Sequence, residues 1–340
     1  MAGTWHGSRQ DGLLAVPHRR KSRTKQGGMG PVTGNASCRM TGANRRSSRL
    51  KARQALEGYA FVAPALILTL VFFIYPLINT VSLSFHDTNV VTGQMRSVGL
   101  RNYANLLSDS VFWKAAKNTT VYTLIVTPLI FITAFVLALL VNKDRPGVVF
   151  FRSVYFLPVV VSFVTASLIW KWMYNDLFGL INYMLMRVGL ISKPVVWLGT
   201  ETSAMLSVIA MVVWKTAGYS MVILLGGMKA IPNSVYEAAS IDGSSKWNTF
   251  WHITFPLLRP TFALALVLSV IGSFLAFDHF YVMTQGGPAH ATETIVMWIY
   301  RNSFGYFKLG YGSAMSVVLL AFLVLLSTLQ LKILRTDFEY

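Results

Sequence analysis

Six long apolar stretches constrain the fold of this chain more than any other feature of its sequence. Each contains at most one Asp, Glu, Lys or Arg, and a helix needs about 20 apolar residues to cross ~30 Å of hydrocarbon. Helices satisfy their own backbone hydrogen bonds in lipid, and every stretch is too long for a strand. The predicted transmembrane helices are residues 59–85, 119–141, 154–174, 204–226, 261–283 and 314–334. We therefore expect an all-α membrane protein with six transmembrane helices.

The composition agrees with this expectation and limits the possible functions. Of the 340 residues 54% are hydrophobic and 13% are charged, whereas a soluble domain usually carries about a quarter charged residues. The single cysteine, Cys38, excludes an intramolecular disulfide and a cysteine metal cluster. The sequence contains no G-x-x-x-x-G-K-[ST] loop, no H-E-x-x-H motif and no nucleophile motif. We predict that the chain is not an enzyme and binds no cofactor of its own.

A basic tail precedes the first apolar stretch. Residues 1–57 hold twelve Lys and Arg against Asp11 and Glu57, so they supply +10 of the net charge of +17. Such a tail could be a nucleic-acid arm, but its place directly before an apolar segment favours a cytoplasmic anchor. We predict a disordered tail over residues 1–48 and a membrane domain over residues 49–340, with both termini in the cytoplasm.

The loop between the fourth and fifth stretches, residues 231–256, carries the most information. Ser234 followed by Glu237 predicts a capping box that starts a helix, and Gly243 predicts its end. Ser244 or Ser245 can cap a second short helix, in which Trp247 and nearby aromatic residues recur at helical spacing. The pattern leaves two interpretations open, an interfacial connector or an element that docks on a partner. A DNA-reading helix-turn-helix is disfavoured because the loop is tethered to the membrane at both ends.

A family resemblance decides between these interpretations. Glu237-Ala238-Ala239, then Gly243, then Ile-Thr-Phe-Pro at 253–256 resembles the EAA loop of binding-protein-dependent ABC importer permeases, with Phe255 where the family has Leu. Further stretches resemble the carbohydrate branch, the maltose-type and glycerol-phosphate-type permeases, in the order in which that branch has them. They are residues 99–103, 112–113 with 118–119, 150–158, 178–182 and 284–288. The resemblance extends from about Leu56 to the C-terminus.

The resemblance implies a role for each residue of the loop. The loop would be a coupling helix seated in a cleft of a cytoplasmic ATPase, where Glu237 faces a basic residue. Ala238 and Ala239 would allow close approach, Gly243 would make the bend, and the matched motif ends with Ile253 and Pro256. Such permeases form half of a pore that is completed by a second permease, two ATPase copies and an external solute-binding protein. The implied location is the cytoplasmic membrane of a bacterium or archaeon, with ATP bound by the partner subunits.

Polar and aromatic residues inside the stretches are candidates for the solute pathway. An ionisable group in lipid is costly, so Lys215 in the fourth stretch and Asp278 in the fifth suggest function by default. The alternative for Lys215 is structural: pairing with a carboxylate, or extension along its own helix. Tyr219 lies four residues after Lys215, which places both on one helix face. The candidate pathway is Lys215, Tyr219, Asp278, Trp214, Phe277 and Tyr281.

The sequence and the family resemblance together predict a permease subunit that imports a sugar. Glycerol 3-phosphate, a polyol or another small solute remains open. A secondary transporter is the rival mechanism, but we find neither an internal repeat nor a midplane ion site for it.

Overall fold

The structure, a computed structural model, describes residue 54 and residues 57–89, 93–142 and 145–334. The predicted basic tail, residues 1–48, lies outside the described residues. The chain forms two units, Met1–Ile67 and Leu68–Tyr340. The described part of the first unit is helical from residue 57 onward. The site discussed below belongs to the second unit.

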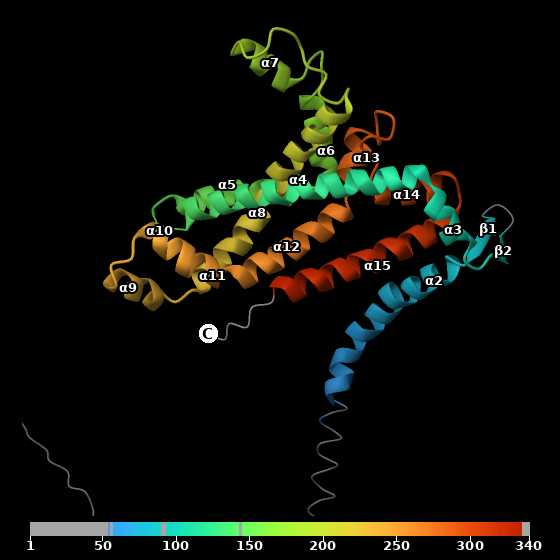
Figure 1. Cartoon of the computed structure of the whole chain (residues 1–340), viewed down its shortest axis with the longest axis horizontal. Helices are drawn as coiled ribbons and strands as arrows, with labels where there is room; N and C mark the ends of the chain where they lie inside the picture. The colour runs from blue at the N-terminus through green and yellow to red at the C-terminus, as the bar shows by residue number, and fades with distance from the viewer. Residues whose placement is uncertain (1–53, 55–56, 90–92, 143–144, 335–340) are drawn as a thin grey trace, which may run out of the picture. The chain divides into compact units, whose positions relative to one another are not determined.

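Helices make up almost all of the second unit (Figure 1). The α-helices are α2 (Tyr75–Leu83), α3 (Arg101–Ser108), α4 (Ser110–Val141), α5 (Val148–Val160), α6 (Phe163–Met173), α7 (Leu180–Arg187), α8 (Glu201–Ala230), α9 (Asn233–Ile241), α10 (Lys246–Thr249), α11 (Phe255–Leu257), α12 (Arg259–Phe274), α13 (Asp278–Met283), α14 (Ile295–Tyr300) and α15 (Leu309–Leu334). Three π-helical segments, η1 (Leu70–Ile74), η2 (Phe250–Thr254) and η3 (Arg301–Gly305), continue neighbouring helices. Strands β1 (His86–Asn89) and β2 (Gln94–Ser97) form an antiparallel hairpin that pairs His86 with Ser97.

The predicted helical membrane fold is confirmed. Five helices among the described residues are long and apolar enough to cross a membrane, and a bent pair makes a sixth span if its two helices are counted together. The five are Glu57–Leu83, Ser110–Val141, Glu201–Ala230, Arg259–Met283 and Leu309–Leu334. The second begins well before the predicted residue 119, because Asp109 caps it by accepting hydrogen bonds from the backbone N–H groups of Val111 and Phe112.

The third span differs from the prediction of one unbroken helix over residues 154–174. It consists of α5 and α6, which meet at a bend of 95°. Pro158 in the last turn of α5 lacks an N–H group and weakens the helix there. Ser162 is in an extended conformation and its hydroxyl accepts a hydrogen bond from the N–H of Thr165, which starts α6 in a new direction.

Helix α8 is the centre of the fold. It packs against α4 and α5, and α12 also contacts it. Two glycines allow these close approaches, because a Cβ at Gly218 would overlap the carbonyl of Tyr155 in α5 and a Cβ at Gly227 would overlap Thr261 in α12. In contrast, the C-terminal half of α15 is largely exposed within this chain. Small residues thus set the contacts of the central helix.

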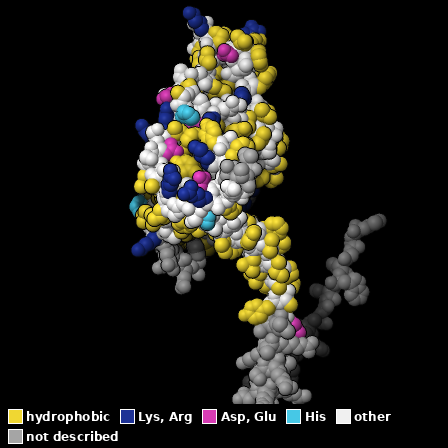
Figure 2. Space-filling model, turned by 90° about the vertical axis from the view of Figure 1, so that its right-hand side faces the viewer, with side chains coloured by type: hydrophobic (Ala, Val, Ile, Leu, Met, Phe, Trp, Pro, Cys, Tyr) yellow, Lys and Arg dark blue, Asp and Glu magenta, His cyan; other side chains and the backbone are white. Residues whose placement is uncertain are grey.

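Polar elements lie at the two opposite ends of the second unit (Figure 1). The coupling-loop end contains residues 231–256, that is α9, α10, η2 and the start of α11. The hairpin end contains β1, β2, α3 and residues 284–308. Figure 2 shows the side of the molecule that includes this end, where Lys, Arg, Asp, Glu and His side chains gather between apolar flanks. Under the predicted topology the first end faces the cytoplasm and the second faces outward.

Candidate functional site

The coupling-loop end contains the two short helices that the sequence predicts. The capping box at Ser234 is wrong, because α9 begins at Asn233 after Pro232 and has no side-chain cap. The residue before a proline is driven into an extended conformation, so α8 ends at Ala230 and α9 follows directly. The predicted bend is confirmed: Gly243 has φ of 71°, a left-handed conformation that favours glycine.

The second short helix and the exposure of the loop also follow from local sequence. The Ser245 hydroxyl accepts a hydrogen bond from the N–H of Asn248 and caps α10. Glu237 and Ala238 are exposed, whereas Ala239 is buried within the chain. Ile253 and Pro256 are half-buried where the loop joins α12. The loop therefore exposes a carboxylate and a small side chain on its surface.

Aromatic rings connect this loop to two long helices. Trp251 contacts Phe250 at 5.2 Å and Phe255 at 5.4 Å between ring centroids. Phe250 lies 5.6 Å from Phe135 in α4, and Phe255 lies 5.6 Å from Phe262 in α12. At the outer edge of this aromatic chain, Trp247 is 73% exposed. The aromatic chain thus packs η2 and α11, which continue the second short helix, onto α4 and α12.

Lys215 contacts the break in the third span. Its side chain is 4% exposed, and its ammonium donates to the carbonyls of Pro158 at 3.2 Å and Val159 at 3.4 Å, and to that of Val161. The bend deprives these carbonyls of their helical partners, and water is absent from the hydrocarbon core. The ammonium also lies 4.6 Å from the ring of Phe163. Lys215 forms no ion pair with a carboxylate among the described residues, so its contacts are with backbone and a ring.

A cavity of about 190 Å³ lies beside this break. Its walls come from α4, α6, α8, α12 and α13, and they combine aromatic rings with hydroxyl groups. The polar and aromatic residues are Tyr122, Phe163, Thr216, Tyr219, Ser220, Ser269, Ser273 and His279. The Tyr122 hydroxyl and His279 Nε2 are 3.2 Å apart, and both side chains are buried. We call this the central cavity.

The structure distributes the six predicted pathway residues over different places. Tyr219 lines the central cavity, while Lys215, on the preceding turn, points to the helix break. Phe277 and Tyr281 stack at 5.2 Å and continue to Tyr300. Trp214 packs on Trp170 at 5.5 Å, and Asp278 is exposed at the start of α13.

The candidate pathway leaves out two buried polar groups in this region. His279 follows the chosen Asp278 near the outer end of the fifth stretch, and the flanking Phe277 and Phe280 were the available signal of its burial. Glu293 is fully buried, and its carboxylate forms an ion pair with Arg301 and a hydrogen bond with His290 Nδ1, each at 3.1 Å. Its carboxylate lies against Gly286, where a side chain would collide with it. Glu293 thus fixes the 284–288 loop.

The stretches that resemble carbohydrate permeases make structural contacts. The Asn118 amide donates to the carbonyls of His290 and Glu293, which joins the 118–119 stretch to the segment that directly follows residues 284–288. The Asn102 amide likewise holds the carbonyls of Ser84 and His86. Asn102 and Asn118 therefore stabilise the hairpin end.

The described residues include no group of three His, Cys, Asp or Glu side chains that could hold a metal ion. The central cavity offers hydroxyl groups and aromatic rings for binding a small molecule, and the loop of residues 231–256 offers an exposed surface.

Comparison with known proteins agrees with these features. Over 285 residues the chain is 37% identical to the trehalose/maltose transport system permease protein MalF of Thermococcus litoralis, which covers 84% of this chain and 95% of that protein. It is 33% identical to the sn-glycerol-3-phosphate transport system permease protein UgpA of Agrobacterium fabrum, over 83% of this chain and 96% of that protein.

A solved structure has the same fold. It is a bacterial ABC transporter involved in the import of the acidic polysaccharide alginate, with a TM-score of 0.74 at 22% identity, covering 87% of this chain and 100% of the matched chain. Residues 119–337 match the family described as the binding-protein-dependent transport system inner membrane component. The long apolar helices, the bent loop of residues 231–256 and these matches lead to one conclusion: the chain belongs to the binding-protein-dependent transport system inner membrane component family, the permeases of ABC importers.

Proposed function

We propose that this chain forms half of the translocation pathway of an ATP-driven sugar importer and is coupled to a separate ATPase through α9 and α10. The observation that carries the proposal is the aromatic chain from the loop to α4 and α12. Both helices also line the central cavity, through Tyr122 on α4 and Ser269 and Ser273 on α12. Displacement of the loop would therefore move two walls of the cavity.

The coupling follows from differential binding. The exposed Glu237 carboxylate has no side-chain partner among the described residues and would meet a basic residue of the ATPase. Ala238 would allow close approach, and Gly243 would keep the bend. ATP bound by two ATPase copies shifts the permease between two states to the extent that docking is tighter in one of them.

The central cavity favours an uncharged solute. Its described lining contains hydroxyl groups, aromatic rings and His279, and no Lys, Arg, Asp or Glu. The Lys215 ammonium already contacts carbonyls of the helix break. A neutral sugar would use the hydroxyls as donors and acceptors and the rings as flat contact surfaces. Trp214, Phe277, Tyr281 and Asp278 would contact it outside the cavity. The trehalose and maltose named for one relative agree with this choice, and the glycerol 3-phosphate of the other is the alternative.

The remaining partners complete the pathway. A second permease would cover the exposed apolar helices, and a solute-binding protein would deliver the sugar to the hairpin end. We place the complex in the cytoplasmic membrane of a bacterium or archaeon, with both termini of this chain in the cytoplasm.

Reconstitution tests this proposal. The chain would be co-expressed with the neighbouring permease and ATPase genes, purified and placed in proteoliposomes with the solute-binding protein outside. We expect uptake of a radiolabelled neutral sugar only when ATP is inside. Uptake that is driven by an ion gradient and is independent of the ATPase would contradict the coupling and favour a secondary transporter. Uptake restricted to glycerol 3-phosphate would overturn the sugar assignment alone.

A further inference from the structure

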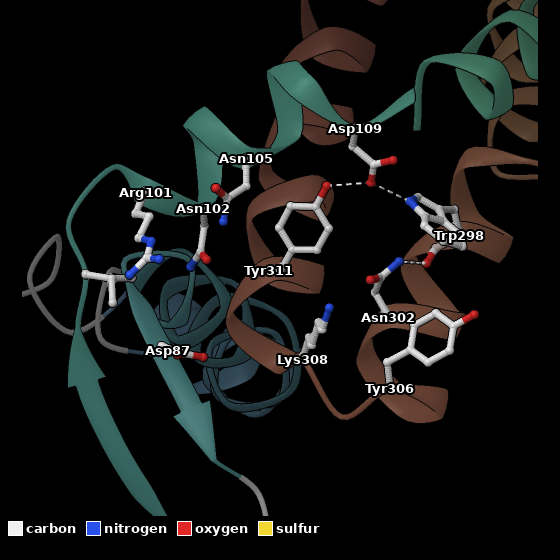
Figure 3. A pocket seen from close by; sticks show the side chains of 11 residues that line it. Asp87, Arg101, Asn102, Asn105, Asp109, Trp298, Asn302, Tyr306, Lys308 and Tyr311 are labelled. Atoms are coloured by element: carbon white, nitrogen blue, oxygen red, sulfur yellow. Dashed lines mark hydrogen bonds between the residues drawn. The ribbon is translucent and has the colours of Figure 1, made fainter. Parts of the chain in front are cut away.

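A second polar pocket, separate from the central cavity, opens at the hairpin end (Figure 3). It has a volume of about 480 Å³, within the range of small-molecule sites. Its walls come from β1, α3, α14, η3 and the start of α15. It shares no lining residue with the central cavity. The pocket at the hairpin end and the central cavity are therefore two separate sites.

Asp109 organises one wall of this pocket. One of its carboxylate oxygens accepts from the N–H groups of Val111 and Phe112. The other accepts from the Trp298 indole at 2.9 Å and the Tyr311 hydroxyl at 2.7 Å (Figure 3). Burial alone would raise the pKa of Asp109, but these four hydrogen bonds outweigh it and lower the pKa. The ionised carboxylate fixes two aromatic rings at the pocket wall.

The other polar side chains of the pocket are available. Figure 3 shows Arg101, Asn105, Lys308 and Tyr306 around its rim. Neither the Arg101 guanidinium nor the Lys308 ammonium is in an ion pair within the described residues, and the same holds for the carboxylate of Asp87. The Asn105 amide and the Tyr306 hydroxyl likewise have no hydrogen-bond partner there. The pocket thus offers free donors and acceptors beside ordered aromatic rings.

The charges of the lining balance. Arg101 and Lys308 stand against Asp87 and Asp109, so the pocket favours neither an anion nor a cation. Asn amides, a tyrosine hydroxyl and paired charges supply both donors and acceptors, which suits a ligand whose hydroxyl groups do both. The rings of Trp298 and Tyr306 add flat apolar contact with a polar edge. A side chain of one charge or an apolar peptide segment would leave most of these groups unmatched.

We propose that this pocket is an outer binding site for an uncharged, hydroxyl-rich saccharide. That the pocket faces the external solution rests on the topology given under the proposed function, whereas binding itself rests on the lining alone. The site would hold sugar at the hairpin end before it reaches the central cavity.

Photolabelling tests the proposal on the full chain in phosphatidylcholine nanodiscs. The probe is a methyl glucoside that carries a diazirine, and methyl α-glucoside serves as the competitor. We expect labelled peptides from residues 98–109 and 298–311, and loss of that label with excess competitor. Arg101→Met and Asn105→Leu should each reduce the label about five-fold, as expected for one lost hydrogen bond or charge contact. Both residues are exposed, so the variants should fold normally.

Arg96→Met is the matched control, because Arg96 is an exposed residue of β2 outside the pocket and its removal changes the net charge equally. Its label should be unchanged. Absence of competed label in these peptides would overturn the proposal. So would a photoreactive residue at position 105 that captures the solute-binding protein in the assembled importer irrespective of added sugar, since the pocket would then be a protein socket. Normal labelling in a chain that fails to transport would refute the proposed function and leave this site standing.

Discussion

Two charged residues, Glu237 in the coupling loop and Lys215 at the helix break, show how differently this chain uses a charge. Glu237 is exposed on α9 and has no partner among the described residues, whereas Lys215 is buried and bonds to carbonyls of Pro158, Val159 and Val161. A group without an internal partner is available to another protein. A buried group that satisfies the backbone contributes to the fold, and its removal leaves polar atoms unpaired in lipid.

Reversal of the charge at Glu237 should have the largest effect on transport. Glu237→Lys places a like charge opposite a basic ATPase residue, which costs several kcal/mol. We expect uptake to fall on the order of 100-fold, while the thermal stability of the chain stays unchanged. Uptake in proteoliposomes and co-purification of the ATPase measure this. Asp242→Lys, an equal change at an exposed residue of the same loop, should retain most activity; near-normal uptake by Glu237→Lys would refute the coupling role.

Removal of the Lys215 ammonium should act on stability instead. Lys215→Met leaves the carbonyls of the broken span without their donor, at a cost of roughly 2–4 kcal/mol in the free energy of unfolding. Denaturation in detergent measures it. Lys171→Met is the control, because Lys171 is exposed and donates to one carbonyl, that of Val282. If Lys215→Met left the stability unchanged and weakened the affinity for solute, Lys215 would belong to the solute pathway after all.

Smaller changes are expected for the residues proposed to contact solute. Tyr219→Phe removes one hydroxyl at the central cavity. Asp278→Asn removes the charge of the residue that precedes the cavity-lining His279. Each should weaken the apparent affinity for sugar about five-fold, the size of one hydrogen bond. Solute-stimulated ATPase activity of the assembled complex gives the affinity, with Tyr183→Phe on the exposed α7 as the control. Wild-type affinity in both variants would remove these two residues from the pathway.

The aromatic chain predicts a modest loss of coupling. Phe135→Leu loses the ring contacts with Phe250 and Phe262, which we expect to reduce sugar moved per ATP about two-fold while ATP hydrolysis continues. Phe131→Leu is the control, because Phe131 contacts Phe262 and has no ring contact with Phe250. Equal losses in both variants would mean that the path through Phe250 has no special role.

The smallest effect is expected for the tail. Deletion of residues 1–39 leaves Arg45, Arg46, Arg49, Lys51 and Arg53 beside the first span, which suffice for topology. Uptake by the shortened chain should equal that of the full chain at equal insertion. A loss of uptake under that condition would show a further role of the tail.

The sequence by itself determined the features that depend on neighbouring residues. Apolar length predicted the spans, Gly243 predicted the bend, and Ser244 or Ser245 predicted the start of a second short helix, because lipid thickness, backbone freedom and capping all act over a few residues. The contiguous pattern from Glu237 to Pro256 likewise identified the family. The capping box at Ser234 failed because Pro232 imposed the helix start two residues earlier.

Only the tertiary structure decided the use of the polar groups inside the molecule. Lys215 and Tyr219 are spaced for one helix face. The bend between α5 and α6 nevertheless brings backbone carbonyls such as that of Val161 to Lys215, whereas Tyr219 lines the central cavity. The pairing of Tyr122 with His279 joins α4 to α13, and the contacts of Asp109 with Trp298 and Tyr311 join the start of α4 to α14 and α15. A buried polar group takes the partner that folding brings within reach, and that partner lies too far along the chain for a local pattern to reveal it.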